Sequence, residues 1–167
     1  LENLFNFSKT KLRSYERVGE ATALAILSFK DWDKVDRIIE QSANIGAHII
    51  TLADKEYPQL LKEIYDPPLI LWIKGDVNAL AKPGIGVIGT RNASTSGKKI
   101  ANKLSSELAS QGLCIFSGLA YGIDTIAHKA ALESEGITVA VLGSGIDVLY
   151  PPENKDVANK IVKSGGA

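Results

Sequence analysis

The chain has 167 residues, 45% of them hydrophobic, and its 19 basic and 19 acidic side chains give a formal net charge of zero. This composition is typical of a globular protein of one or two domains, and no apolar run approaches the roughly 18 residues that cross a bilayer, which excludes an integral membrane protein. Charge is balanced in both halves of the chain: residues 1–83 carry 11 basic and 12 acidic side chains, and residues 84–167 carry 8 basic and 7 acidic ones. This balance excludes a diffuse basic surface.

Two further features concern location and completeness. The N-terminal end does not combine a basic segment with an apolar one, as an export signal would. The single cysteine, Cys114, lies in an apolar run without a partner for an internal disulfide, so we expect a small buried hydrophobic residue in a protein of the reducing cytoplasm. The sequence contains no methionine, not even an initiator, which suggests a fragment or a processed chain.

Residues 1–66 are predicted to form a small, mainly helical domain. Apolar residues recur there at helical spacing, and Gly19 indicates a turn. The predicted elements are helices over Tyr15–Phe29 and Lys34–Ile45, a short β-branched run over His48–Leu52 and a helix over Gln59–Ile64.

Residues 67–83 are predicted to be a linker that contains one strand. The prolines of Asp66-Pro67-Pro68 disfavour helix in the residues before them. Leu69–Lys74 is apolar enough for a strand, which Gly75 ends.

Residues 84–167 have a different pattern, in which short apolar strands alternate with helices. The strands are predicted over Ile85–Gly89, Leu113–Phe116 and Thr138–Leu142, and the helices over Ser96–Gln111, Ile123–Ser134 and Asn154–Lys163. This alternation indicates a parallel sheet with right-handed crossovers. The predicted fold class is therefore α/β, a partial, truncated Rossmann-like sheet preceded by the helical domain. In the first helix, Ile100, Leu104 and Leu108 predict the buried stripe.

The carboxyl ends of the three predicted strands form the candidate ligand site, because ligands of open parallel sheets bind there. All three strands end in glycine-containing turns, where backbone can approach a ligand and the next helix offers N–H groups to an anion. We therefore expect a phosphate-binding edge. Its candidate residues are Gly89, Thr90, Arg91, Asn92, Ser94, Ser117, Gly118, Tyr121, Gly122, Gly143 and Gly145.

Arg91 is the residue of this edge best suited to a phosphate, because a guanidinium offers two parallel hydrogen bonds to phosphate oxygens. The alternative is a surface arginine paired with an acid such as Asp124. Thr90, Ser94 and Ser96 add hydroxyl groups, and one of the two serines is expected to cap the next helix.

Several other sites are not indicated. The turns match neither the G-x-G-x-x-G dinucleotide fingerprint nor a G-x-x-x-x-G-K-[ST] loop. Asp124 would suit a general base, but an acid in the first turn of a helix is explained by the helix dipole. His128 has no metal-ligand partner at useful spacing. No nucleophile has a neighbouring base, so we expect no catalytic centre, no metal and no cofactor.

Tyr121 lies between two glycine turns at the same edge. Its ring would offer a surface on which a nucleobase stacks, a common contact in proteins that bind single strands. The alternative is that the ring packs on the domain surface. Further along, Tyr150-Pro151-Pro152 indicates a rigid turn.

Taken together, these motifs resemble the DNA-processing protein DprA (Smf) family. The matching stretches occur in family order, and they are Tyr57-Pro58, Asp66-Pro67-Pro68, Lys74-Gly75, Val87–Gly97, Ser117–His128 and Ala140–Asn154. The helical segment with Val18–Ala23 resembles the SAM-like N-terminal module of that family.

The resemblance implies a Rossmann-like core that binds single-stranded DNA and loads the RecA recombinase onto incoming DNA in natural transformation, without a reaction of its own. It implies that Arg91 holds the DNA backbone. Some members have lysine at the position of Tyr121, so the resemblance implies that tyrosine there removes one phosphate contact and replaces it with stacking on a base. A homodimer and the recombinase contact surface are implied for segments after Ala167. The alternative is a nucleotide phosphoribohydrolase of the LOG-like Rossmann families, although their P-G-G-x-G-T-x-x-E motif is absent from this sequence.

Overall fold

The computed structural model describes residues 4–167 of the protein. Its backbone contacts divide the chain into two compact units, Leu1–Glu40 and Gln41–Ala167. The predicted domain ranges, 1–66, 67–83 and 84–167, place the boundaries elsewhere. Periodicity along a sequence identifies single elements, whereas the division depends on which distant segments pair.

The N-terminal unit is built from short helices. They are η1 (Leu4–Asn6), α1 (Lys9–Arg13), α2 (Glu20–Ser28) and the first part of α3 (Trp32–Asn44). The side chain of Ser8 caps α1 by accepting a hydrogen bond from the Lys11 backbone N–H at 3.2 Å. Arg17 has a φ of 65°, so the helix predicted over Tyr15–Phe29 begins only at Glu20. The SAM-like character of this unit stays a prediction.

The second unit opens with a two-stranded antiparallel sheet. β1 (Ala47–Thr51) pairs with β2 (Ile70–Lys74), so that Ala47 lies opposite Lys74. Between them lie α4 (Gln59–Lys62) and a turn held by the Tyr57 hydroxyl, which donates to the Pro68 carbonyl oxygen at 2.7 Å. The strand predicted as part of a linker is therefore paired with a strand assigned to the preceding domain.

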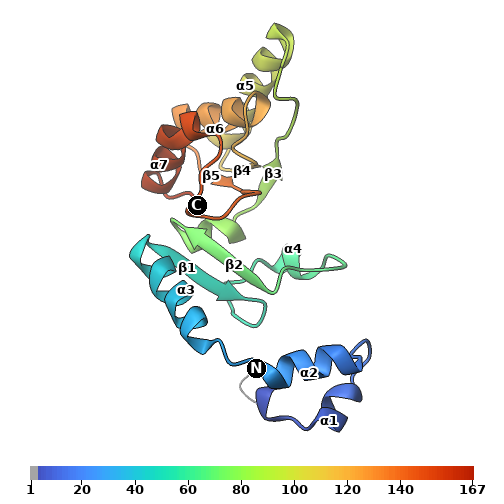
Figure 1. Cartoon of the computed structure of the whole chain (residues 1–167). Coiled ribbons are helices and arrows are strands. Elements are labelled where there is room, and N and C mark those ends of the chain that lie inside the picture. The colour runs from blue at the N-terminus through green and yellow to red at the C-terminus, as the bar shows by residue number, and fades with distance from the viewer. Residues whose placement is uncertain (1–3) are drawn as a thin grey trace. The chain divides into compact units, whose positions relative to one another are not determined.

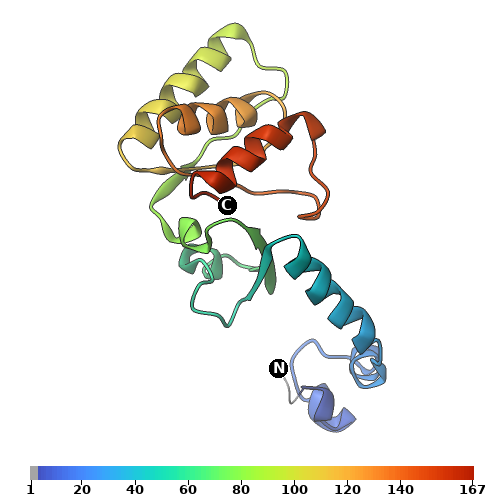
Figure 2. The same ribbon diagram turned by 90° about the vertical axis from the view of Figure 1, so that its left-hand side faces the viewer.

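The larger sheet of this unit has three parallel strands in the order β3-β4-β5. The strands are β3 (Gly84–Gly86), β4 (Cys114–Ser117) and β5 (Thr138–Ala140), and the helices between and after them are α5 (Thr95–Ser110), α6 (Ile123–Glu133) and α7 (Lys155–Lys163). Two 3-10 turns, η2 (Val77–Ala81) and η3 (Pro152–Asn154), precede β3 and α7. Figures 1 and 2 show α6 lying between α5 and α7 over the sheet. The predicted Rossmann-like α/β arrangement is confirmed.

The two faces of β4 are covered by different elements. Ile115 packs with small residues of α5 and α6 in one core cluster. Cys114 packs instead with Ala79 of η2 and Val139 of β5. The alternation follows from the two-residue period of a strand. Cys114 is fully buried, as predicted, and burial raises the pKa of its thiol to about 11.

The buried face of α5 differs from the prediction. Ile100 and Leu104 are 66% and 45% exposed, so the predicted stripe is wrong at these two positions, whereas Leu108 is partly buried against the core. The buried positions are instead Ala101, Ser105 and Ala109, one residue further along the same helical spacing. Close packing of α5 on α6 explains the shift, because neighbouring helices approach closely only where the facing side chains are small.

Within the described part of the chain, no helix is both long and apolar enough to cross a membrane.

Candidate functional site

Three loops meet at the carboxyl edge of the parallel sheet. We call them the β3 loop (residues 87–94), the β4 loop (residues 118–122) and the β5 loop (residues 141–151), after the strands that they follow. Parallel strands end at the same edge, so the topology brings together turns that are about 25 residues apart in the sequence. The predicted site residues, apart from Ser117 at the end of β4, all lie in these loops.

The β3 and β4 loops pack directly against each other. A Cβ at Gly89 would lie 2.6 Å from the Ile123 side chain. One at Gly122, whose φ is 81°, would lie 2.3 Å from the Thr90 carbonyl oxygen and 2.5 Å from that of Arg91. The Ile123 backbone N–H also donates to Thr90 O at 3.3 Å. These two glycines therefore permit contact between loops, whereas the sequence suggested that they leave room for a ligand.

Arg91 lies in the β3 loop, and its side chain is exposed. Among residues 4–167, no salt bridge involves its guanidinium. The alternative partner, Asp124, is 7% exposed, and its Oδ2 accepts a hydrogen bond from the Gly118 backbone N–H at 3.2 Å. Asp124 therefore orders the β4 loop at the start of α6, and the charge of Arg91 is available to an anion.

The hydroxyl groups near Arg91 make local hydrogen bonds. Ser94 caps α5 by accepting from the Gly97 backbone N–H at 3.2 Å, which confirms that one of the two serines is the cap. Thr90 Oγ1 accepts from the backbone N–H of Asn92, an exposed residue, at 3.2 Å. Ser117 is buried, and its hydroxyl donates to the Val87 carbonyl oxygen at 2.6 Å. Its side chain thus joins β4 to the β3 loop and does not face solvent.

The β4 loop is held by hydrogen bonds from Asn154, a residue that was not predicted from the sequence. Asn154 is 5% exposed, and its side-chain amide donates to the Leu119 carbonyl oxygen and to Thr125 Oγ1, both at 2.7 Å. Leu119 is fully buried with a φ of 55°. An Asn two residues after a Tyr-Pro-Pro turn was the available signal, but its partner lies 35 residues earlier.

Tyr121 and Glu153 form a second connection between the loops. The Tyr121 hydroxyl donates to Glu153 Oε2 at 2.6 Å, and its ring makes an edge-to-face contact with Tyr150 at a centroid distance of 6.3 Å. The hydrogen bond to the carboxylate raises the pKa of Tyr121 to about 12 and lowers that of Glu153. Neither Tyr150 nor Glu153 was among the predicted site residues.

The remaining predicted residues, Gly143 and Gly145, lie exposed in the β5 loop. A Cβ at Gly143 would meet nothing within 4 Å, and one at Gly145 would meet only the carboxylate of Asp147. The tip of the β5 loop is therefore less tightly packed than the β3 and β4 loops, and its backbone is accessible.

His128 is fully buried behind the β4 strand. Its Nδ1 lies 2.7 Å from Thr138 Oγ1, and burial lowers its pKa to about 4 because the charged imidazolium is poorly solvated there. A neutral buried histidine of this kind belongs to the core. Over the described range 4–167, no group of three or more His, Cys, Asp or Glu side chains is placed to hold a metal ion.

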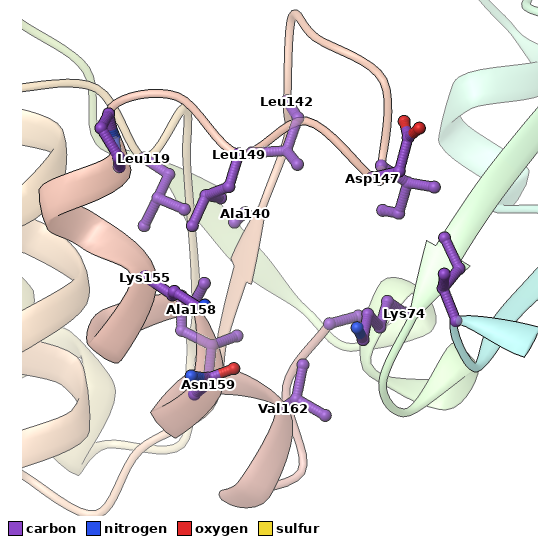
Figure 3. Close-up of a pocket in the computed structure, with 15 residues that line it drawn as sticks. Lys74, Leu119, Ala140, Leu142, Asp147, Leu149, Lys155, Ala158, Asn159 and Val162 are labelled. Atoms are coloured by element: carbon purple, nitrogen blue, oxygen red, sulfur yellow. The ribbon is translucent and has the colours of Figure 1, made fainter.

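A pocket of about 380 Å³ lies between α7 and the end of β2, and its lining also includes Leu119 of the β4 loop and several residues of the β5 loop. Figure 3 shows Leu142, Leu149 and Ala158 on one side of it and Lys74 on the other. Its lining is mostly apolar and includes none of the predicted site residues. The candidate site is thus an open surface of loops rather than this pocket.

A parallel sheet with an exposed arginine and helix N-termini at its carboxyl edge defines a Rossmann-like domain. Within this class, the chain belongs to the DNA recombination-mediator protein A family, whose sequence profile matches residues 48–167.

Known proteins with similar sequences and structures agree with this assignment. The chain is 39% identical over 133 residues to the DNA processing protein DprA of Bacillus subtilis, covering 79% of this chain and 45% of that protein. The X-ray structure of DNA processing protein A from Streptococcus pneumoniae superposes with a TM-score of 0.77 at 33% identity, covering 95% of this chain and 53% of that one.

A structure of the Helicobacter pylori protein, described for its single-stranded DNA binding mode, has a TM-score of 0.61 at 33% identity and covers 71% of this chain and 53% of that one. The chain therefore spans about half the length of the relatives that it matches.

Proposed function

We propose that this chain binds single-stranded DNA at the carboxyl edge of its parallel sheet and takes part in DNA processing. The observation that carries the proposal is Arg91, an exposed guanidinium without a salt bridge among the described residues, set on a loop whose backbone is fixed by its neighbour. The H. pylori relative, which is described by its single-stranded DNA binding mode, supports the choice of ligand.

The expected contact is with phosphate groups. The guanidinium of Arg91 donates two parallel hydrogen bonds to phosphate oxygens, and the capped N-terminus of α5 favours negative charge nearby. Because the formal net charge of the chain is zero, long-range attraction contributes little and affinity depends on these local contacts. Few phosphates are neutralised, so we expect a shallow dependence of affinity on salt.

The wider role that we propose is that of a mediator without catalysis or cofactor. In this proposal, the protein loads the RecA recombinase onto incoming single strands in the cytoplasm during natural transformation. The family description, a mediator of DNA recombination, supports the link to a recombinase. We further propose that the full-length protein acts as a homodimer, which would bring two such edges onto one strand.

The test is binding of a labelled oligo-dT, and of the same length of duplex, measured by fluorescence anisotropy across a salt series. The wild-type chain is expected to prefer the single strand. Arg91→Ala is expected to weaken oligo-dT binding at least tenfold, or about 1.4 kcal/mol, because it removes a charge-assisted contact. The matched control is Arg37→Ala, which removes another exposed arginine, from α3.

Equal affinity of wild type and Arg91→Ala for oligo-dT would overturn the assignment of the site. A preference for duplex would overturn the assignment of the ligand. Release of free adenine from AMP would instead favour the phosphoribohydrolase alternative, and the proposal without catalysis would then be abandoned.

A further inference from the structure

Two exposed aromatic rings meet at the same edge of the sheet as Arg91. Tyr121 of the β4 loop is 38% exposed, and Tyr150 at the end of the β5 loop is 59% exposed. Their rings are nearly perpendicular, at 81°, with centroids 6.3 Å apart. Aromatic rings carry large apolar surfaces whose removal from water is favourable, so a pair that stays exposed beside a ligand site is suited to contact the ligand.

The chemistry around Tyr121 disfavours a phosphate at this point. Its hydroxyl donates to Glu153 at 2.6 Å, and this hydrogen bond raises the pKa of Tyr121 to about 12. The neighbouring Glu153 carboxylate repels a phosphate and is held in its charged form by the same hydrogen bond. What remains available is aromatic surface, which suits the uncharged face of a nucleobase.

Tyr150 is the more exposed of the two rings, and its backbone is anchored. The next residue, Pro151, is fully buried, and its carbonyl oxygen accepts a hydrogen bond from the Asn154 backbone N–H at 3.1 Å. The edge-to-face contact with Tyr121 further restricts the ring. A ring that is already ordered loses little conformational freedom on binding, which favours affinity.

The aromatic pair and the arginine are close along the edge. Tyr121 directly precedes Gly122, the residue that packs on the carbonyl groups of Thr90 and Arg91. The β4 loop therefore joins a cationic position on one side to an aromatic position on the other. A single strand presents phosphates and bases along opposite sides of its backbone, which matches this division.

We propose that Tyr150, braced by Tyr121, stacks on a base of bound single-stranded DNA while Arg91 contacts its phosphates, a proposal that rests on the proposed function. The β5 loop thereby supplies a base contact and the β3 loop a phosphate contact. Because stacking tolerates any base, this arrangement gives preference for single strands over duplex without sequence specificity.

The experiment compares two labelled strands of equal length, oligo-dT and a strand with abasic sites throughout, which keeps the phosphates and removes the bases. Tyr150→Ala is expected to weaken binding of oligo-dT about tenfold, as the loss of one stacking contact predicts. It is expected to change binding of the abasic strand less than about twofold, because no base contact exists to lose. Tyr150→Phe, which keeps the ring, is expected to bind both strands like wild type.

Arg91→Ala provides the complementary variant and is expected to weaken binding of both strands. Tyr150→Leu, which keeps apolar bulk without an aromatic face, guards against a folding defect in the alanine variant and is expected to behave like it. If wild type binds oligo-dT and Tyr150→Ala binds it equally well, or loses the same factor on both strands, the stacking proposal is overturned and the proposed function stands. If wild type binds neither strand, the proposed function itself fails.

Discussion

The β3 and β4 loops occupy equivalent positions in the sheet, yet their polar groups are used differently. In the β4 loop, hydrogen bonds come from distant parts of the chain, since Leu119 O is bound by Asn154 and Tyr121 by Glu153. In the β3 loop, only backbone carbonyl oxygens, those of Val87 and Thr90, accept from distant residues, whereas the side-chain hydrogen bonds of Thr90 and Ser94 reach only two or three residues along the chain.

This difference indicates a division between support and binding. The β4 loop is fixed by buried contacts, and the β3 loop packs on it through Gly89 and Gly122. In the proposed function, Arg91 is thereby held by its backbone while its side chain contacts the ligand. Binding groups are most effective when the backbone that carries them is already ordered.

The largest expected effect comes from breaking the contact between the loops. Gly122→Ala would place a Cβ 2.3 Å from the Thr90 carbonyl oxygen at a φ of 81°, and the obstacle is backbone that no rotamer change removes. We expect a loss of about 3 kcal/mol in the free energy of unfolding, measured by urea denaturation. Binding of oligo-dT is expected to fall at least tenfold, because Arg91 would be displaced.

Gly143→Ala is the matched control for this prediction. A Cβ at Gly143 would have no atom within 4 Å, so its stability is expected to stay within about 0.5 kcal/mol of wild type. Equal stability of the two variants would contradict the proposed role of Gly122 in joining the loops.

The parts of this arrangement that sequence patterns predict are those set by local periodicity. The strands of the parallel sheet are confirmed because apolar runs alternate with helical spacing, and the Ser94 cap is confirmed because capping needs only the next few residues. The partnership of Tyr121 with Glu153 spans 32 residues and depends on how two loops meet, which no local pattern contains.

The same limit explains the error on α5. Hydrophobicity favours Ile100 and Leu104 for the core, but the face that meets α6 is chosen by how closely the two helices approach. Small residues such as Ala101 occupy the buried positions because they allow the two helices to approach closely, although each buries little apolar surface by itself.

Acid is expected to destabilise the core of the second unit through the buried His128. Its pKa is about 4 in the folded protein because of burial, against an ordinary value of 6.5, so the unfolded chain takes up a proton first as pH falls. The stability of the folded state is therefore complete above pH 6.5 and is lost progressively between pH 6.5 and pH 4. The loss from this residue reaches about 3 kcal/mol at most, and the Asp124 charge acts against it.

The measurement is urea denaturation of wild type and His128→Asn at pH 7 and pH 4.5. The variant has no titrating group at this position, so its stability is expected to fall less between the two pH values. Parallel decreases in the two proteins would contradict a titration of His128.

The smallest expected effects compare the loops directly, by removing one supporting hydrogen-bond group from each. Asn154→Ala leaves the buried Leu119 carbonyl oxygen without its donor, and we expect a loss of about 2 kcal/mol in unfolding free energy. Ser94→Ala removes an exposed helix cap and is expected to lose about 1 kcal/mol. Asn159→Ala and Ser96→Ala, at exposed positions of α7 and α5, serve as matched controls.

Hydrogen exchange distinguishes the two variants more sharply than stability does. Asn154→Ala is expected to speed exchange of the backbone amides in the β4 loop and, through Gly122, in the β3 loop as well. Ser94→Ala is expected to speed exchange only at the start of α5, because its hydrogen bond reaches no further than Gly97. Faster exchange in the β4 loop of Ser94→Ala would show that the β3 loop also stabilises the β4 loop. This result would contradict the view that only the β4 loop stabilises the β3 loop.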